Sequence, residues 1–326
     1  MTETERVLAV AELGKFTERQ AGFLVRVMLH SGVCVGRQYC TYARIVRGQK
    51  MVDFFQKLVG KRYATPYSCG HNKATLYHVH HVDLYEAIGQ KHARFRKRMA
   101  LGRAVERLII LDHVIGHVET TWLGAEDDKV SHFLGSTPLG RDQLPRVVFG
   151  TNGDRTTRFF PDKLPIGMSP DKRSYVLLYL VVDPATRDFR TFLRRHAELL
   201  RALPKWTVRM LVPVGLEECV EDYRRAFREE LATPLHAQVA DELRWFCHHG
   251  KTSGPAERTR LLRARRAFRS PRFLALRRAC ALDGDRAIDV ATSNSLADAV
   301  ARGDGRLECH EVSRQYLHLS ALVGTA

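Results

Sequence analysis

The first element that the apolar and polar pattern predicts is an amphipathic helix beginning after Thr17. Thr17 and Gln20 have the identity and spacing of a capping box, and Phe16 stands where a hydrophobic staple begins. Apolar residues then recur at helical spacing, namely Phe23, Leu24, Val27 and Met28. Ser31-Gly32 is expected to end this helix.

Two shorter helices and a pair of strands are predicted next. The helices cover Arg37 to Val46 and Gln49 to Val59, with Arg47-Gly48 as the turn between them. Residues 63–81 alternate as two strands around a turn-forming tetrapeptide at 70–73. Three helices followed by a two-stranded ribbon is the order of a winged helix-turn-helix. Its third helix enters the major groove of DNA, and its ribbon contacts nearby phosphates.

The outer face of the predicted third helix carries side chains that can reach base edges and phosphates. These candidate DNA contacts are Gln49, Lys50, Asp53, Gln56 and Lys57. Further candidates flank this helix or lie at the ribbon tip, and they are Arg37, Lys61, Arg62 and Lys73. Two alternatives stay open, a solvated helix face and a winged helix that contacts another protein.

A dense basic run, Lys91 to Arg98, follows the ribbon. Its candidate DNA contacts are Arg94, Arg96, Lys97 and Arg98. The run leads into a helix predicted over Met99 to His117, whose apolar seam consists of Ala104, Leu108, Leu111 and Ile115. Such residues would add affinity without sequence preference if they lay along the DNA backbone, or they could simply form a solvated helix start.

From Leu144 onward the pattern changes to strands. Residues 144–150, 156–167 and 174–183 are predicted strands, and the last is nearly continuous in apolar residues, as a central strand is. A helix over 185–203 follows, and then a buried strand over 206–215. The chain as a whole is therefore expected to be α+β.

Phe160-Pro161-Asp162, followed by a strand ending at Asp183, a helix and a further strand, has a recognisable layout. With the N-terminal module, it resembles the replication-relaxation type proteins of plasmids and integrative mobile elements over about residues 15–215. The C-terminal half of those proteins is similar to the PD-(D/E)XK nuclease fold. The resemblance thus implies an α/β domain of that kind and a role in the biology of mobile elements.

A PD-(D/E)XK site needs two acids and a lysine two residues after the second acid, so that Mg²⁺ and water are held together. Asp162 fills the first place and Asp183 the second, but Ala185 occupies the lysine position. We therefore expect no catalytic residue and no cofactor. The alternative is a metal-dependent endonuclease that uses Asp162, Asp183 and Mg²⁺. The sequence has no phosphate loop, dinucleotide-binding glycine motif, zinc-protease motif or nucleophile elbow.

A group of cysteine and histidine residues near the ribbon invites a zinc interpretation. It consists of Cys69, His71, His78, His80 and His81. Structural zinc sites favour two close pairs of ligands on turns, whereas three of these histidines lie on an extended segment. The sequence favours polar residues of a solvated ribbon over a metal site.

The chain has 326 residues, a formal net charge of +16 and a pI near 9.8. Residues 1–118 contain 19 basic and 9 acidic residues, residues 119–250 contain 19 of each, and residues 251–326 contain 14 and 8. Two basic regions around a neutral one favour a polyanionic partner. Seven scattered cysteines argue against a disulfide framework, and neither a signal peptide nor a membrane span is apparent, so we expect a cytoplasmic protein.

Residues 257–278 contain nine arginines and no lysine. A helix with a break at Ser270-Pro271 is predicted here, and Arg263 and Arg266 are its candidate DNA contacts. A membrane-surface helix and a solvated face are the alternatives.

The expected organisation is a winged helix-turn-helix (1–90), a basic linker helix (91–118), a nuclease-like domain (119–250) and a basic helical region (251–326). The expected function is sequence-specific binding of double-stranded DNA, near the nucleoid, as a transcriptional regulator or an accessory factor in replication, transfer or recombination. A homodimer and a recombinase or replication protein are the expected partners, without a membrane. A non-catalytic adaptor for other proteins is a further alternative.

Overall fold

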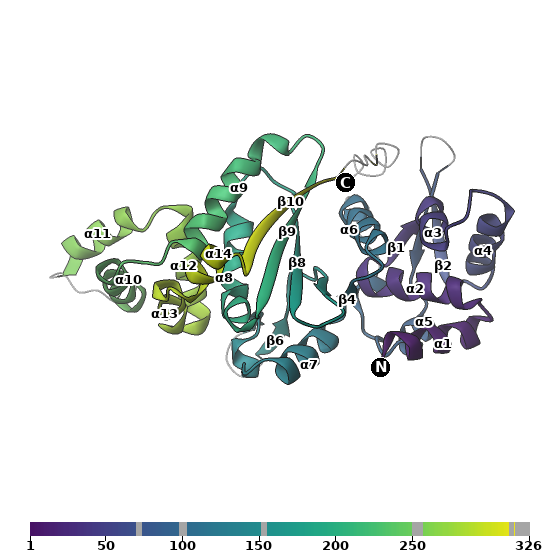
Figure 1. The fold of residues 1–326 in the computed structure, drawn as a ribbon, viewed down its shortest axis with the longest axis horizontal. Coiled ribbons are helices and arrows are strands. Elements are labelled where there is room, and N and C mark those ends of the chain that lie inside the picture. The colour runs from purple at the N-terminus through teal and green to yellow at the C-terminus, as the bar shows by residue number, and fades with distance from the viewer. Residues whose placement is uncertain (70–73, 98–102, 151–154, 250–256, 313–315, 317–326) are drawn as a thin grey trace. The chain divides into compact units, whose positions relative to one another are not determined.

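The computed structural model describes residues 1–69, 74–97, 103–150, 155–249, 257–312 and 316, which form a mixed α+β structure (Figure 1). Two compact units are present, unit 1 with Met1–Ala125 and Val312–Ala326, and unit 2 with Glu126–Glu311. The expected ribbon-tip residues Lys73 and His71, and Arg98 of the basic run, lie outside the described residues.

Unit 1 contains helices and a small antiparallel sheet with the strand order β1-β3-β2. Its elements are α1 (Glu3–Gly14), α2 (Glu18–His30), β1 (Val33–Val35), α3 (Gly36–Ala43), α4 (Gln49–Gly60), β2 (Ala64–Ser68), β3 (Thr75–Val79), α5 (Val82–Ala87), the 3-10 turn η1 (Arg94–Arg96), α6 (Ala104–Gly116) and β4 (Thr121–Leu123). The three helices and two strands predicted from the sequence are present, while α1 and β1 were not predicted.

The predicted capping box at the start of α2 is confirmed. The Thr17 hydroxyl accepts a hydrogen bond from the Gln20 amide at 3.3 Å, and the Gln20 side-chain oxygen accepts one from the Thr17 amide at 3.1 Å. The predicted apolar face of α2 is fully buried. Helix α1 has a capping box of its own, formed by Thr2 and Glu5.

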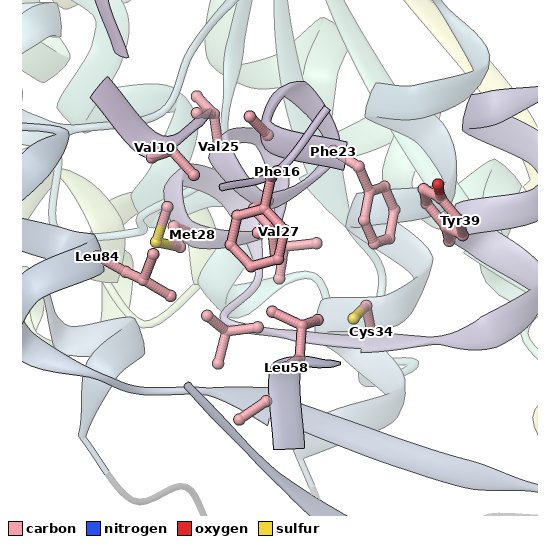
Figure 2. Close-up of a cluster of buried hydrophobic side chains, with 14 of the residues drawn as sticks. Val10, Phe16, Phe23, Val25, Val27, Met28, Cys34, Tyr39, Leu58 and Leu84 are labelled. Atoms are coloured by element: carbon pink, nitrogen blue, oxygen red, sulfur yellow. The ribbon is translucent and has the colours of Figure 1, made fainter. Parts of the chain in front are cut away.

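Aromatic side chains anchor α4 to the rest of unit 1. Phe54 stacks on Tyr39 of α3 with ring centroids 4.3 Å apart, and Phe55 stacks on Tyr77 of β3 at 4.0 Å. Figure 2 shows Tyr39 beside Phe23 in the same core, whose ring centroids are 5.3 Å apart. Because these rings fix one face of α4 in the core, the opposite face is turned to solvent.

Helix α6 belongs to the core of unit 1, where it packs against α2 and α3. Its predicted apolar seam is buried, with Leu108 and Leu111 fully enclosed. The helix begins at Ala104 rather than at Met99 as predicted, and Met99 itself lies outside the described residues. Residues 94–96 of the basic run form the 3-10 turn η1 instead of entering this helix.

Unit 2 combines a sheet with helices. Its elements are α7 (Glu126–Ser136), η3 (Arg141–Gln143), β5 (Arg146–Phe149), β6 (Thr156–Phe159), β7 (Ile166–Met168), β8 (Ser174–Leu180), α8 (Arg187–Ala202), β9 (Lys205–Pro213), η4 (Glu217–Cys219), α9 (Val220–Phe227), the π-helical turn η5 (Arg228–Ala232), α10 (Ala237–His249), α11 (Arg258–Ala267), α12 (Pro271–Asp283), α13 (Arg286–Thr292), α14 (Ser295–Arg302) and β10 (Gly305–Val312).

The predicted strand-helix-strand segment of unit 2 is confirmed. Strands β8 and β9 are parallel neighbours, connected by α8, with Leu177 opposite Val208. Strand β7 pairs antiparallel with β8, and β10 lies next to β9 (Figure 1). Parallel strands require such a crossover, and the apolar side of α8 covers the strands. That side consists of Phe189, Phe192, Leu193, Leu199 and Leu200, all buried as predicted.

The helices after residue 236 form a second apolar cluster within unit 2. Leu243 and Phe246 of α10, Ala264 of α11, Leu276 of α12 and Ile288 of α13 are among its buried members. Helix α12 packs along α8.

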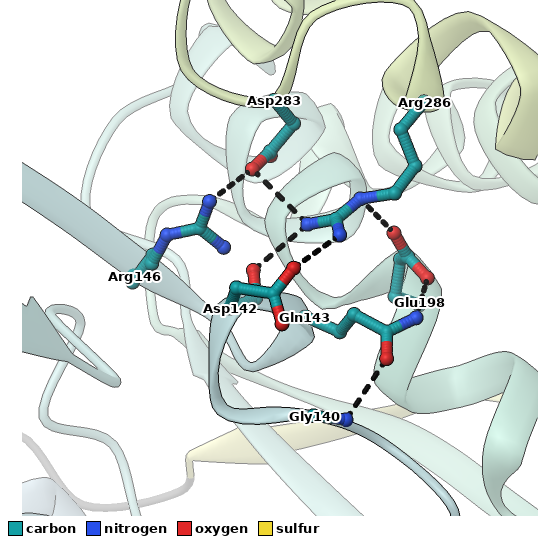
Figure 3. A network of polar contacts seen from close by, with 7 residues as sticks. All are labelled: Gly140, Asp142, Gln143, Arg146, Glu198, Asp283 and Arg286. Carbon is teal, nitrogen blue, oxygen red and sulfur yellow. Dashed lines mark hydrogen bonds and ion pairs between the residues drawn. The ribbon is translucent and has the colours of Figure 1, made fainter.

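Polar contacts join these helices to the rest of unit 2. Arg286 of α13 pairs with Asp142 at 2.6 Å and with Glu198 of α8 at 2.8 Å (Figure 3). Asp283 also accepts a hydrogen bond from Arg146 of β5 at 2.7 Å. Helices α12 and α13 are thereby fixed against α8 and β5.

Within the described ranges, no helix combines the length and the apolar character that crossing a bilayer requires.

Candidate nucleic-acid interface

The outer face of α4 exposes most of the residues predicted from the sequence. Gln49, Lys50, Asp53 and Gln56 are exposed on this helix. The Gln49 amide nitrogen donates to Asp53 Oδ1 at 2.6 Å, which orients both side chains along the same face. Lys50 extends from the first turn of α4, where an ammonium group can reach a phosphate.

Three predicted contacts at the other end of α4 differ in their surroundings. The Lys57 ammonium donates to the Lys15 carbonyl and lies over the Phe16 ring, 4.7 Å from its centroid. Burial, with Lys61 and Lys15 nearby, lowers the pKa of Lys57. Lys57 therefore fastens α4 to the junction between α1 and α2. Lys61 and Arg62 are exposed directly after the helix.

Arg37 has a structural role inside unit 1. Its Nη2 atom donates to Asp112 of α6 at 2.8 Å and to the Tyr316 hydroxyl at 2.7 Å. The Arg37 side chain is 21% exposed, and these partners raise its pKa. The guanidinium is thus engaged within the protein, and we no longer include Arg37 among the candidate DNA contacts.

The turn between α3 and α4 adds two basic residues that the sequence reasoning did not select. Arg44 and Arg47 are both exposed, and Arg44 ends α3 in the left-handed conformation with φ of 53°. Both belong to the segment Arg-Ile-Val-Arg-Gly, in which Arg44 lies near the end of the predicted helix and Arg47 opens the predicted turn. The signal for them in the sequence is two arginines within four residues at the turn of a predicted helix-turn-helix.

A hollow of about 930 Å³ adjoins the first turn of α4. Lys50 and Asp53 line it together with residues of α1, of the N-terminal part of α2 and of α3. Glu18 and Arg19 also lie on its wall, so that charges of both signs face the hollow. The wall is therefore mixed in charge, and the basic side of this region is the α3–α4 turn with Lys50.

The basic segment after α5 is held by its backbone, which leaves some of its side chains exposed. The Phe95 carbonyl is 3.0 Å from His78 Nε2, and Arg96 Nε donates to the Lys91 carbonyl at 3.1 Å. Arg94 and Lys97 are exposed. The exposed cationic side chains Arg94 and Lys97 thus lie in or beside a 3-10 turn, whereas the sequence suggested the start of a basic helix.

The interpretation of Cys69 and the histidines as residues of a solvated ribbon is wrong for Cys69 and His78. Cys69 is 7% exposed and His78 is 5% exposed. His78 lies opposite Val33 of β1, and its Nε2 atom is 3.0 Å from the Phe95 carbonyl. Burial lowers the pKa of His78 and His80. His80 Nε2 is 2.8 Å from the Thr65 hydroxyl, and His81 Nδ1 caps α5. Within the described ranges, no three metal-ligating side chains are grouped so as to hold an ion.

Helix α11 exposes the arginines that were predicted to contact DNA. Arg263 and Arg266 are exposed, as is Arg265 between them, while Ala264 and Phe268 face the apolar cluster. Leu262 on the same helix is 53% exposed. Across the ranges that the structure describes, no carboxylate forms an ion pair with Arg263 or Arg266, whereas Arg260 pairs with Glu242 at 2.8 Å.

The two candidate nuclease carboxylates have separate local partners. Asp162 Oδ1 accepts a hydrogen bond from Arg195 of α8 at 2.6 Å, and Asp162 Oδ2 is buried. Asp183 Oδ1 accepts one from the Ala185 amide at 2.7 Å, as in a turn that starts a helix. Each carboxylate thus accepts a hydrogen bond from a residue of unit 2.

Two buried basic groups surround Asp162. Lys129 of α7 donates to the Leu164 carbonyl at 2.8 Å, and burial lowers its pKa to about 8. Burial likewise lowers the pKa of His196 on α8 to about 4. The adjoining cavity measures only about 10 Å³, roughly the space of a single water molecule.

Comparison with protein-family models, curated proteins and solved structures gives no match to this chain. A proposal for the function therefore rests on the exposed side chains and the residues around them.

Proposed function

We propose that unit 1 is a winged helix-turn-helix that binds double-stranded DNA through α4. The order α2, β1, α3, α4, β2, β3 and the strand order β1-β3-β2 support this proposal. Strand β1, absent from the sequence-based expectation, completes a three-stranded sheet at the base of the ribbon. In this arrangement α4 is the recognition helix.

The observation that carries the proposal is the contrast between the two faces of α4. Phe54, Phe55 and Leu58 hold one face in the core, and Gln49, Lys50, Asp53 and Gln56 project from the other. Glutamine can bond adenine in a bidentate way, a carboxylate can accept from cytosine, and lysine binds guanine or phosphate. Arg44 and Arg47 beside this face supply phosphate contacts.

Unit 2 would add backbone contacts through α11. Arg263 and Arg266 carry guanidinium groups that suit phosphate oxygens. A single winged helix reads few base pairs, so that specific binding favours a homodimer on two half-sites. The resemblance noted above extends the proposal to DNA of a mobile element, where the protein would act as a regulator or accessory factor.

The test compares charge reversals in the full-length protein by fluorescence anisotropy with duplex DNA fragments. Lys50→Glu is expected to weaken binding by about tenfold, because it places a carboxylate next to the phosphates. Lys205→Glu is the matched control, since Lys205 is an exposed lysine at the start of β9 in unit 2. That variant is expected to bind like the wild type.

Salt dependence gives a second readout. Contact with about six phosphates predicts a log-log slope of affinity against salt near −5. A flat response, or equal losses in Lys50→Glu and Lys205→Glu, would reject α4 as the DNA-binding helix and favour an adaptor.

A further inference from the structure

Two cysteines meet where α10 packs against α12. Cys247 directly follows Phe246, and Cys280 lies one helical turn after Leu276, so that both occupy the edge of the apolar cluster. Their side chains share a hydrogen bond and line the same hollow of about 760 Å³. Both side chains are partly exposed, and small reagents can therefore reach the pair.

The hollow around the two thiols is strongly basic. Its charged lining consists of Arg187, His248, Arg265, Arg277 and Arg278. These residues come from α8, α10, α11 and α12, so that every element around the hollow contributes a cationic or titratable group. The Asp283 and Asp285 carboxylates raise the pKa of Cys280, and Asp285 is 2.9 Å from His248 Nε2.

The two thiols have different acidities. The hydrogen bond with Cys280, helped by Arg277 and His248, lowers the pKa of Cys247 to about 7, although burial and Asp285 raise it. The same hydrogen bond raises the pKa of Cys280. Since the thiolate is the reactive form, this difference favours Cys247 over Cys280 as the thiol that attacks first.

Four other cysteines in the chain differ from Cys247. They are Cys34, Cys40, Cys69 and Cys219, which are buried. Burial raises the pKa of each of them. Their thiols are therefore protonated and shielded, which makes them internal references for reactivity.

We propose that Cys247 and Cys280 form a redox-active dithiol that reduces small anionic disulfides, which the basic hollow attracts through their carboxylates. The Cys247 thiolate attacks one sulfur of the disulfide, its S–S bond breaks, and the first thiol leaves after taking up a proton. Cys280 then loses its proton and attacks the Cys247 sulfur, which releases the second thiol. The protein loses two protons and two electrons, and α10 becomes covalently linked to α12.

The test treats reduced full-length protein with oxidised glutathione and measures intact and peptide masses after acid quenching. We expect a loss of two hydrogens that maps to a Cys247–Cys280 disulfide. Cys280→Ser should accumulate one glutathionyl group on Cys247, and Cys247→Ser should form no disulfide at this site. Cys309→Ser, which alters another partly exposed cysteine, should react like the wild type.

The role of the basic hollow is tested with a neutral disulfide, bis(2-hydroxyethyl) disulfide. The wild type should react faster with oxidised glutathione than with the neutral reagent, and Arg277→Gln should bring the two rates together. The rate of the wild type should rise as the pH passes through about 7. Adducts spread evenly over the cysteines, or a wild-type protein that stays reduced, would overturn the proposal. Neither outcome bears on DNA binding by α4.

Discussion

The Tyr316 hydroxyl donates a hydrogen bond to the Asp112 carboxylate within unit 1. Arg37 Nη2 donates to both of these groups, so that α3, α6 and the segment at residue 316 share one polar cluster. Tyr316 is 6% exposed, and a group buried in this way depends on its partners. This cluster holds the Arg37 guanidinium within unit 1, whereas the sequence placed Arg37 among the candidate DNA contacts.

Tyr316→Phe is therefore expected to lower the free energy of unfolding by about 1–2 kcal/mol, because Arg37 and Asp112 each lose a partner in a largely buried site. Urea denaturation of the full-length protein measures this change. Tyr67→Phe is the control, since Tyr67 is half-buried on β2, and it should change stability by less than about 0.5 kcal/mol. Similar effects of the two substitutions would contradict a stabilising role for the cluster.

The sequence predicted the helices and strands well where one residue pattern determines one element. Thr17 caps α2, and the apolar side of α8 is buried, because capping and periodicity are local properties. Strand β1 was missed because three buried residues show no alternation. Helix α1 was missed because its buried positions include Arg6 and Gly14, which do not form an apolar face.

The candidate site was predicted less well, because periodicity shows which face of a helix is polar but not what covers it. Lys57 has the spacing of a recognition residue, yet Phe16 and the Lys15 carbonyl lie against it. Tyr316 reaches Arg37 from the far end of the chain, which no local pattern reveals. His78 was expected in solvent and is covered by the Phe95 segment.

The exposed arginines of α11 are predicted to contact phosphates and not bases. The double variant Arg263→Gln/Arg266→Gln should reduce the magnitude of the log-log salt slope by about 2, with an equal loss of affinity for different DNA sequences. Anisotropy titrations at several salt concentrations measure the slope. Arg224→Gln/Arg225→Gln is the matched control, since these residues pair with Glu221 at 3.6 Å and Asp222 at 3.1 Å. A slope that changes equally in both double variants would exclude this role.

His196 is predicted to make the stability of unit 2 depend on pH. Burial lowers its pKa from 6.5 to about 4 in the folded state, so that the unfolded chain binds a proton more readily between these values. The contribution of neutral His196 to the free energy of unfolding is therefore fully present above pH 6.5. Up to about 3 kcal/mol of this free energy is lost as the pH falls towards 4.

His196→Gln removes this titration, and its stability relative to the wild type should rise as the pH is lowered from 7 to 4.5. Denaturation curves of both proteins at each pH give the difference. A difference that is constant with pH would mean that His196 is protonated alike in both states.

Two glycines of unit 2 are predicted to respond in opposite directions to alanine. A Cβ atom at Gly305 of β10 would lie 2.7 Å from Trp206 Cε2, and Trp206 is 1% exposed, so that its ring has no space to move. Gly305→Ala should therefore lower the stability by about 1–3 kcal/mol.

A Cβ atom at Gly135 of α7 meets no atom within 4 Å. Gly135→Ala should raise the stability by up to about 1 kcal/mol, because alanine favours the helix. Thermal melting of the two variants distinguishes these outcomes. A melting temperature that rises for Gly305→Ala would show that Trp206 does not pack tightly against β10, and one that falls for Gly135→Ala would show that α7 gains nothing from alanine.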